Sequence, residues 1–366
     1  SIAAIPSLLA AEGVHRPLLV TGPNIVKTIG RRIMSILDAA GYDYAVFSEV
    51  EANPSVATAE RCYALYKERL CEGFIALGGG SPMDTAKAAA ARAARPDRSL
   101  AEMAGLLRVG RPTPPLIAVP TTSGTGSEAT VAAVITDRET NHKYAVMDLH
   151  LIPRRAVLDP ELTRGLPPML TATTGMDALT HAVEAYIGSE NTRNTKKYAI
   201  EATQLVFKYL KRAYDNGQDK EARNMMQKAS LLAGMAFTRA YVGYVHAIAH
   251  SLGGFYGVPH GLANAVILPH VLDAYGEKAH KKLAQLADAV GIKGANDAEK
   301  AKAFIQAIKD MNAAMDIPTK IEGKWTIKEE DIPTMVERAL SEANPLYPVP
   351  VIWGKEEMAA MYREIM

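Results

Sequence analysis

The first 160 residues alternate short apolar runs with longer amphipathic segments, and this alternation restricts the possible folds more than any other feature of the chain. The short runs are rich in residues that favour buried strands, and we expect strands at 18–20, 44–47, 74–77 and 116–119. We expect helices between them at 25–40, 58–70 and 82–94. Strand, helix and strand in repetition predict βαβ units on a parallel sheet, and such sheets bind ligands at the carboxyl ends of their strands.

Beyond residue 160 the strand pattern is lost and helical segments dominate. Prolines at 160, 167 and 168 interrupt both periodicities, so we place a domain boundary there, with domains at 1–160 and 161–366. The expected helices lie at 173–186, 195–214, 221–237, 244–255, 278–290, 298–314, 330–342 and 355–364. The sequence therefore predicts an α/β domain with a parallel sheet, followed by an all-α domain.

Charge and composition exclude several classes of partner. Lys and Arg number 41 and Asp and Glu number 40, with no block of like charge, so nothing indicates binding to nucleic acid or to an anionic membrane. The longest apolar runs are strand-sized, far below the roughly 20 residues that span a bilayer. Cys62 and Cys71 are too few for a disulfide framework, which indicates a reduced, cytoplasmic setting.

A glycine-rich loop, Gly78-Gly79-Gly80-Ser81-Pro82-Met83-Asp84, follows the strand expected at 74–77. Glycines let the backbone approach a phosphate closely, and the start of the next helix offers free N–H groups to an anion. We expect Ser81 to cap that helix, with Pro82 in its first turn. The alternative is a tight turn without a ligand, and the chain has no Gly-x-Gly-x-x-Gly fingerprint.

A second run of small residues, PTTSGTGSE from Pro120 to Glu128, follows the strand expected at 116–119. Its hydroxyls and backbone amides would make a poor core but a good cradle for phosphate or ribose. The alternative is a flexible surface loop. Because both loops follow parallel strands, a dinucleotide is the leading interpretation.

A third motif combines one carboxylate with several imidazoles. Asp177 and His181 are spaced i, i+4 on one predicted helix, His246 and His250 repeat that spacing, and His260 follows. Such a set suits a divalent transition metal. A single histidine in such a place is more often a satisfied core residue, and the pattern alone does not choose which four of the five ligate.

At these positions the sequence resembles the iron-containing (group III) alcohol dehydrogenase family, from about residue 18 to residue 345. The resemblance is carried by Asn53-Pro54, GGGSPMDTAK from Gly78, PTTSGTGSE from Pro120, Lys143, Asp159-Pro160, GMDALTHAVEAY from Gly175 and HAIAHSLGGFYGVPHG from His246. It implies the dehydroquinate synthase-like fold: an N-terminal dinucleotide-binding domain, a helical C-terminal domain and a metal in the cleft between them. The reaction implied is hydride transfer between NAD(P) and a small primary or secondary alcohol, or its aldehyde or ketone.

The resemblance also implies a role for individual residues. The metal ligands would be Asp177, His181, His246 and His260, with Fe(II) expected and Zn(II) the alternative. His250 would stay unligated, facing the nicotinamide and the substrate as a proton carrier. The cofactor-binding residues would be Gly22, Asn53, Gly79, Gly80, Ser81, Asp84, Thr121, Thr122, Ser123, Thr125, Val134, Lys143 and Leu170. Phe237 would line the substrate pocket, and we expect Val242 and Phe255 to make it apolar enough to favour short unbranched alcohols.

Two departures from the family pattern bear on these expectations. Where NAD-preferring members resemble Val-Thr-Asp after the first strand, this chain has Val20-Thr21-Gly22. Without that carboxylate a 2′-phosphate is not repelled, so NADP stands beside NAD as the expected cofactor. The alternative is that Gly22 is only a turn residue in an enzyme that uses NAD. The segment ahead of the first strand is also short, so we expect the native N-terminus to lie further upstream.

Other functions fit the same motifs less well. A glycerol-type polyol dehydrogenase or a maleylacetate-type reductase is the nearest alternative. A lyase of the dehydroquinate-synthase kind would need several cations for its anionic substrate, and near the metal motifs there is Arg239 but no lysine. A non-catalytic metal-binding protein is the alternative from another class. The family resemblance also implies a homodimer or a larger homo-oligomer.

Overall fold

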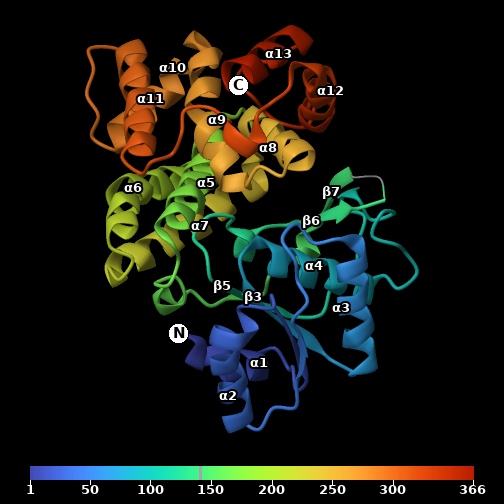
Figure 1. Ribbon diagram of the computed structural model, residues 1–366. Helices are drawn as coiled ribbons and strands as arrows, with labels where there is room; N and C mark the ends of the chain where they lie inside the picture. Colours follow the sequence, from blue (N-terminus) through green and yellow to red (C-terminus); the bar gives the residue numbers. More distant parts are fainter. Residues whose placement is uncertain (140–141) are drawn as a thin grey trace. The chain divides into compact units, whose positions relative to one another are not determined.

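The structure is a computed structural model that describes residues 1–139 and 142–366, and the chain forms two compact units (Figure 1). The first unit comprises residues 1–122 and 126–163, and the second comprises 123–125 and 164–366. The short segment 123–125 belongs to the second unit although it lies within the first in sequence, which the sequence pattern did not indicate.

The first unit is built on a five-stranded parallel sheet with the strand order β2-β1-β3-β5-β8. The strands are β1 (Pro17–Val20), β2 (Ala45–Phe47), β3 (Gly73–Gly78), β5 (Leu116–Pro120) and β8 (Arg155–Ala156). Every residue of β1, β3 and β5 is buried, because helices cover both faces of the sheet. This explains why these strands read as continuous apolar runs rather than as an alternating pattern.

The strand side chains point alternately to the two faces, and each face has its own core. Leu18 and Phe74 pack toward α3 (Val56–Glu68) and α4 (Gly80–Ala94), together with Cys62. Leu19 and Ile75 pack with α1, the π-helical turn η2 and α2 on the other face. The elements of this second face are α1 (Ile5–Ala11), η2 (Val26–Gly30) and α2 (Arg31–Ala39). The expected helix at 25–40 is therefore observed as η2 followed by α2.

A small second sheet with the order β4-β7-β6 belongs to the same unit and was not expected. Its strands are β4 (Gly105–Leu106), β6 (Ala132–Asp137) and β7 (His142–Met147). The antiparallel pair β6 and β7 places Val134 opposite Ala145 and Thr136 opposite Lys143. The buried side chains of this sheet share a core with α3 and α4.

The second unit is helical. Its long helices are α5 (Pro168–Ile187), α6 (Arg193–Asp215), α7 (Lys220–Ala240), α8 (Tyr244–Tyr256), α9 (His260–Tyr275), α10 (Glu277–Ala289), α11 (Asp297–Ala313), α12 (Ile332–Ala343) and α13 (Lys355–Glu364). Helix α5 packs against α6, α7 and α9 and is buried along most of its length. The predicted architecture, a parallel α/β region followed by a helical region, is confirmed.

Helix α9 was missing from the sequence prediction, which expected no helix between residues 255 and 278. In the structure His260 is the first residue of α9, with Pro259 at the N-cap position. From Ala263 to Leu272 nearly every side chain is buried, so the segment shows no polar face with a period of 3.6 residues. Pro269 lies inside the helix, and because proline usually ends a helix, it argues against a helix in the sequence.

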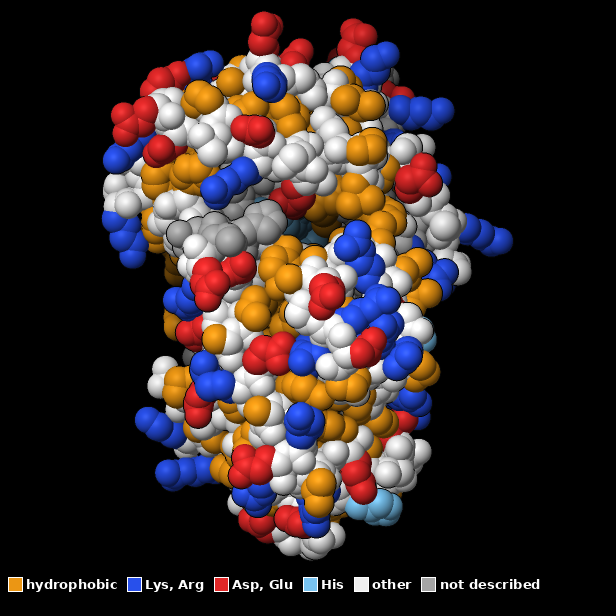
Figure 2. Space-filling view, turned by 90° about the vertical axis from the view of Figure 1, so that its right-hand side faces the viewer, with side chains coloured by type: hydrophobic (Ala, Val, Ile, Leu, Met, Phe, Trp, Pro, Cys, Tyr) orange, Lys and Arg blue, Asp and Glu red, His pale blue; other side chains and the backbone are white. Residues whose placement is uncertain are grey.

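The surface agrees with the balanced charge of the sequence. The face drawn in Figure 2 carries basic and acidic side chains over most of its area, with several basic ones side by side at the middle right. Among the described residues, no helix combines the length and apolar content that a bilayer span requires.

Candidate metal centre and nucleotide-binding loops

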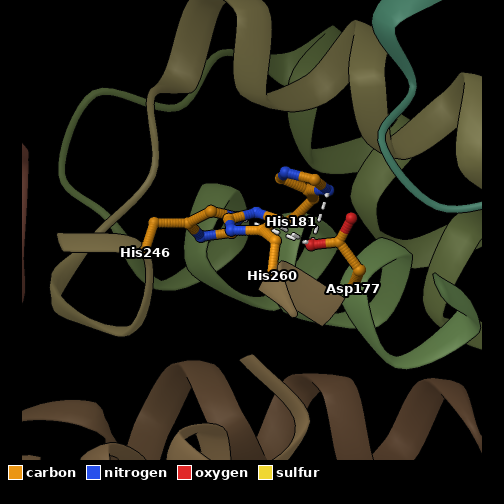
Figure 3. A group of neighbouring side chains, drawn as sticks. All are labelled: Asp177, His181, His246 and His260. Atoms are coloured by element: carbon orange, nitrogen blue, oxygen red, sulfur yellow. Dashed lines mark ion pairs between the residues drawn. The ribbon is translucent and has the colours of Figure 1, made fainter. Parts of the chain in front are cut away.

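Four side chains of the second unit meet in a compact group (Figure 3): Asp177 and His181 from α5, His246 from α8 and His260 from α9. Each offers one ligand atom, and these atoms all lie within 4.8 Å of one another. The distances from Asp177 Oδ1 are 3.4 Å to His260 Nε2, 3.8 Å to His246 Nε2 and 3.9 Å to His181 Nδ1. A carboxylate oxygen facing three imidazole nitrogens is a donor set that suits a divalent transition metal.

Close helix packing brings the four donors together. Asp177 and His181 lie one turn apart on α5. A Cβ atom at Gly261 would lie 2.5 Å from the backbone oxygen of Thr173, so α9 reaches α5 this closely only because residue 261 is glycine. That contact places His260 beside Asp177.

The burial and charge of the group also fit a bound cation. Asp177, His181 and His246 are buried in an apolar helical core, where an uncompensated carboxylate is costly. Among the described residues, the buried Nδ1 of His181 has no hydrogen-bond partner. Burial lowers the pKa of His181, and burial together with the neighbouring histidines holds the pKa of His246 well below its ordinary value. Neutral imidazoles are the form that ligates a metal.

Asn264 is a fully buried neighbour of the group that the sequence analysis did not single out. Its Nδ2 donates to Asp177 Oδ1 over 2.7 Å, and it lies 3.2 Å from His246 Nε2 and 3.1 Å from His260 Nε2. The spacing i, i+4 from His260 would have indicated it, had α9 been recognised as a helix.

Glu184 was also missed, although it lies on the same face of α5 at i+7 from Asp177. Its Oε2 is 2.6 Å from His246 Nδ1, and its Oε1 accepts from the backbone N–H of Val245 over 2.8 Å. Burial raises the pKa of Glu184 to about 8. A Cβ at Gly243 would lie only 2.8 Å from Oε1, so this glycine makes room for the carboxyl group. Glu184 thus directs Nε2 of His246 toward the other three donors.

His250 lies one turn after His246 on α8 and is not part of the group of four. Its ring stacks against that of His260 with centroids 5.2 Å apart, and its Nδ1 lies 2.7 Å from Glu342 Oε1. Burial alone would raise the pKa of Glu342, but the charges and hydrogen bonds around it, above all those of His250, hold its pKa below the ordinary value. His250 is therefore a neighbour of the four candidate ligands but not a member of their group.

The three residues expected to line a substrate pocket lie in different settings. The ring of Phe237, at the end of α7, stacks on His181 with centroids 4.2 Å apart. Val242 lies in the connection between α7 and α8 and is partly buried. Phe255 packs under the guanidinium group of Arg338, 4.6 Å from its ring centroid. Phe237 thus lies directly against one of the four candidate ligands, whereas Phe255 contacts Arg338 of α12.

In the first unit, three of the residues predicted to bind the cofactor follow neighbouring strands of the parallel sheet. Gly22 follows β1, Gly79 follows β3 and Thr121 follows β5. Because β1, β3 and β5 are parallel neighbours, their carboxyl ends lie at the same edge of the sheet. A Cβ at Gly79 would lie 3.2 Å from Thr122 Oγ1, so the two loops are in close contact there.

The helix after the glycine loop begins earlier than expected. Helix α4 starts at Gly80, its N-cap residue is Gly79, and no side chain caps it. The expectation that Ser81 is the cap is therefore wrong. The chain turns already at Gly78, whose φ of +146° and close approach to Pro82 require glycine. Ser81 consequently falls inside the first helical turn, where backbone N–H groups remain free for an anion.

Two polar residues lie one turn apart on α4: Asp84, which is partly buried, and Lys87, which is fully buried. Burial raises the pKa of Asp84 to about 6, and its Oδ1 accepts from Ser127 Oγ over 3.3 Å. The buried ammonium of Lys87 donates to the backbone oxygens of Ser127, Thr130 and Ala132 over 2.7–3.0 Å. Lys87, which the sequence analysis quoted only within a motif, thus fixes the end of the second run of small residues and the segment that follows it.

The remaining predicted cofactor residues are dispersed. Lys143 Nζ donates to Asn53 Oδ1 over 2.7 Å, which joins two positions far apart in sequence. Val134 lies in β6. Ser123, Thr125 and Leu170 belong to the second unit, and Leu170 is an exposed residue in the first turn of α5.

Comparison with known proteins agrees with this architecture. Residues 1–160 match the family model described as iron-containing alcohol dehydrogenase, and residues 171–366 match the model described as Fe-containing alcohol dehydrogenase family, C-terminal. Alcohol dehydrogenase 4 of Schizosaccharomyces pombe is 38% identical over 362 residues, which are 97% of this chain and 83% of the relative. The 1,3-propanediol dehydrogenase of Klebsiella pneumoniae is 39% identical over 335 residues, 91% and 86% of the two chains. A crystal structure of a 1,3-propanediol oxidoreductase superposes with a TM-score of 0.96 at 37% identity, covering 100% of this chain and 96% of the other.

Proposed function

We propose a role for individual residues from the premise that the chain belongs to the iron-containing alcohol dehydrogenase family. Such an enzyme is a metal-dependent oxidoreductase that passes a hydride between NAD(P) and an alcohol or its carbonyl product. The observation that carries the proposal is the meeting of Asp177 with three imidazoles in the second unit. We assign dinucleotide binding to the domain at 1–160, and metal and substrate binding to the domain at 161–366.

The metal ligands in this proposal are Asp177, His181, His246 and His260, and they hold one divalent ion, with Fe(II) expected and Zn(II) as the alternative. When bound, the ion supplies Lewis-acid activation of the substrate oxygen. Glu184 supports the site through its short contact with His246 Nδ1. His250 carries the proton that is exchanged with the substrate hydroxyl, because it lies against His260 without joining the donor group.

The cofactor assignment rests on the sheet edge of the first unit. Gly79, Gly80 and Ser81 at the start of α4 bind the pyrophosphate through backbone N–H groups. Asp84 binds the nicotinamide end, and Gly22 lies at the adenosine ribose. Because Gly22 brings no carboxylate to the 2′ position, NADP is accepted as well as NAD. The remaining contacts come from Asn53, Thr121, Thr122, Ser123, Thr125, Val134, Lys143 and Leu170.

The substrates in this proposal are short unbranched alcohols and their aldehydes, because Phe237 places an apolar ring against His181. A short diol is the second candidate, since relatives at 37–39% identity are named for 1,3-propanediol. Val242 and Phe255 complete the apolar lining. We also expect a cytoplasmic homodimer or larger homo-oligomer, which light scattering of the purified protein would test.

A substrate panel tests the proposal. Metal-reconstituted protein is assayed with 1-propanol, 1-butanol, 1,3-propanediol, glycerol and the matching aldehydes, each with the NAD and the NADP cofactor. We expect turnover of the monoalcohols or the diol with both cofactors, and its loss when a chelator removes the metal. Faster turnover of glycerol than of every monoalcohol would favour the polyol alternative. No nucleotide absorbance change with any pair would overturn the proposed function.

A further inference from the structure

A carboxylate and a phenol lie in series behind the ring of His250. Glu342 Oε1 lies 2.7 Å from Nδ1 of His250, and the Tyr347 hydroxyl donates to the same oxygen over 2.7 Å. The imidazole is only partly exposed, with 26% of its side-chain surface accessible. Glu342 lies in the last turn of α12, far from α8 in sequence. None of the sequence motifs points to Glu342 or Tyr347.

The two helices that carry this series are tied together beside it. Tyr244, the first residue of α8, donates its hydroxyl to Asn344 Oδ1 over 3.0 Å and accepts from the backbone N–H of Trp353 over 2.9 Å. Asn344 is the residue that ends α12. The backbone N–H of Tyr347 donates a hydrogen bond to the backbone oxygen of Ala343 over 2.6 Å. The separation of His250 and Glu342 is therefore fixed by the fold as well as by the contact between their side chains.

This arrangement decides which nitrogen of His250 carries a proton. A neutral imidazole has one N–H donor and one lone-pair acceptor, and the partner of one nitrogen selects the state of the other. An ionised carboxylate only accepts, so Glu342 selects Nδ1–H. Tyr347 stays a donor, because burial and the neighbouring carboxylate raise its pKa well above the ordinary value. The lone pair then lies on Nε2, the nitrogen directed away from Glu342.

We propose that Glu342 and Tyr347 are positioning residues for His250: Tyr347 holds the Glu342 carboxylate, and the carboxylate fixes the orientation of the imidazole and favours the tautomer with N–H at Nδ1. This inference rests on the proposed role of His250 as proton carrier. In alcohol oxidation the substrate O–H bond breaks and its proton passes to Nε2. The electron pair of the O–H bond forms the second carbon–oxygen bond of the carbonyl. The C–H bond on the carbinol carbon breaks, and its hydride passes to the oxidised nucleotide, NAD(P)⁺. In the reverse reaction, the hydride returns to the carbonyl carbon and the proton returns to the carbonyl oxygen.

The experiment compares zinc-loaded variants by steady-state kinetics and by side-chain ¹⁵N NMR of protein labelled at histidine. The His250 signals are assigned by their absence in His250→Gln. In Glu342→Gln we expect the Nδ1–H form of His250 to be lost and kcat to fall about 10–100-fold, the usual range for a residue that orients a functional histidine. Zinc content and cofactor KM should stay unchanged. Tyr347→Phe should give a smaller fall, and Glu337→Gln, an exposed carboxylate of the same helix, should change nothing.

The double variant separates the two proposals. His250→Gln combined with Glu342→Gln should be no slower than His250→Gln alone, since Glu342 acts only through His250. Additive losses, loss of zinc in Glu342→Gln, or an unchanged Nδ1–H signal there would overturn the positioning role while leaving the role of His250 intact. Full kcat in His250→Gln would overturn the proton-carrier role itself, and the positioning role with it.

Discussion

Single ligand side chains should decide metal binding in this chain. Asp177 lies within 3.9 Å of all three imidazole nitrogens and is the only carboxylate in the described group of four. We expect Asp177→Asn and His260→Ala to lose most bound metal and nearly all turnover, because one of four ligands is removed or neutralised. Metal analysis after dialysis measures the loss, with far-UV circular dichroism to check folding. His280→Ala on α10 is the control, and full metal occupancy in both site variants would refute the ligand assignment.

A second residue-scale prediction concerns the choice of nucleotide. Gly22→Asp should lower the ratio of kcat/KM with NADP to kcat/KM with NAD, because a carboxylate accepts from the ribose 2′-OH and repels a 2′-phosphate. A Cβ at this position would lie 3.3 Å from the backbone oxygen of Val50, so a small local adjustment is needed. Gly22→Asn imposes the same adjustment without the charge and is the matched control. Equal ratios in the two variants would show that Gly22 is not at the ribose.

At the scale of helices, the metal centre depends on how closely α9 approaches α5. Gly261→Ala would place a methyl group 2.5 Å from the backbone oxygen of Thr173, which forces the two helices apart. Overpacking of this kind typically costs about 1–3 kcal/mol, and we expect metal affinity to fall although no ligand is changed. Gly254→Ala on α8 meets no atom within 4 Å and serves as the control. The dissociation constant for the metal is measured by titration calorimetry. Equal dissociation constants for both variants and the parent would contradict the prediction.

The elements that the sequence predicted well are those whose pattern is set by local burial. Strands β1, β3 and β5 are buried on both faces, and helices such as α13 have one polar and one apolar side, so both kinds leave a clear periodic signal. The small sheet of β4, β6 and β7 leaves only a weak signal, because β4 has two residues and β6 alternates merely between buried and partly buried positions. Helix α9 was lost because it is apolar on all sides.

The candidate site divides in the same way. The residues that sequence reasoning singled out carry chemistry of their own, such as Asp177 and His246, and their spacing on helices is visible in the chain. Asn264, Glu184 and Glu342 are identified only by their contacts with Asp177, His246 and His250, over 2.6–2.7 Å at the shortest. Glu342 pairs with His250 across 92 positions, a separation at which no periodic pattern exists. Supporting residues of this kind become visible only once the helices are packed.

For the whole molecule, the distribution of the buried cores suggests two units that can open separately. One continuous core runs through the helices of the second unit, while three smaller cores serve the two sheets of the first. All four proposed metal ligands belong to the second unit. A bound ion therefore joins α5, α8 and α9 and stabilises that unit by mass action, by about 2.7 kcal/mol when free metal is 100 times the dissociation constant.

Hydrogen exchange of metal-free and zinc-loaded protein tests this view. We expect zinc to slow exchange of the core amides of α5, α8 and α9, and to leave those of α2 and α3 unchanged, because each unit has a core of its own. Asp177→Asn is the control, since its exchange should not respond to zinc. Equal slowing in α3 and α5 would mean that the chain opens as one cooperative unit, and the division near residue 160 would then describe the fold without describing its stability.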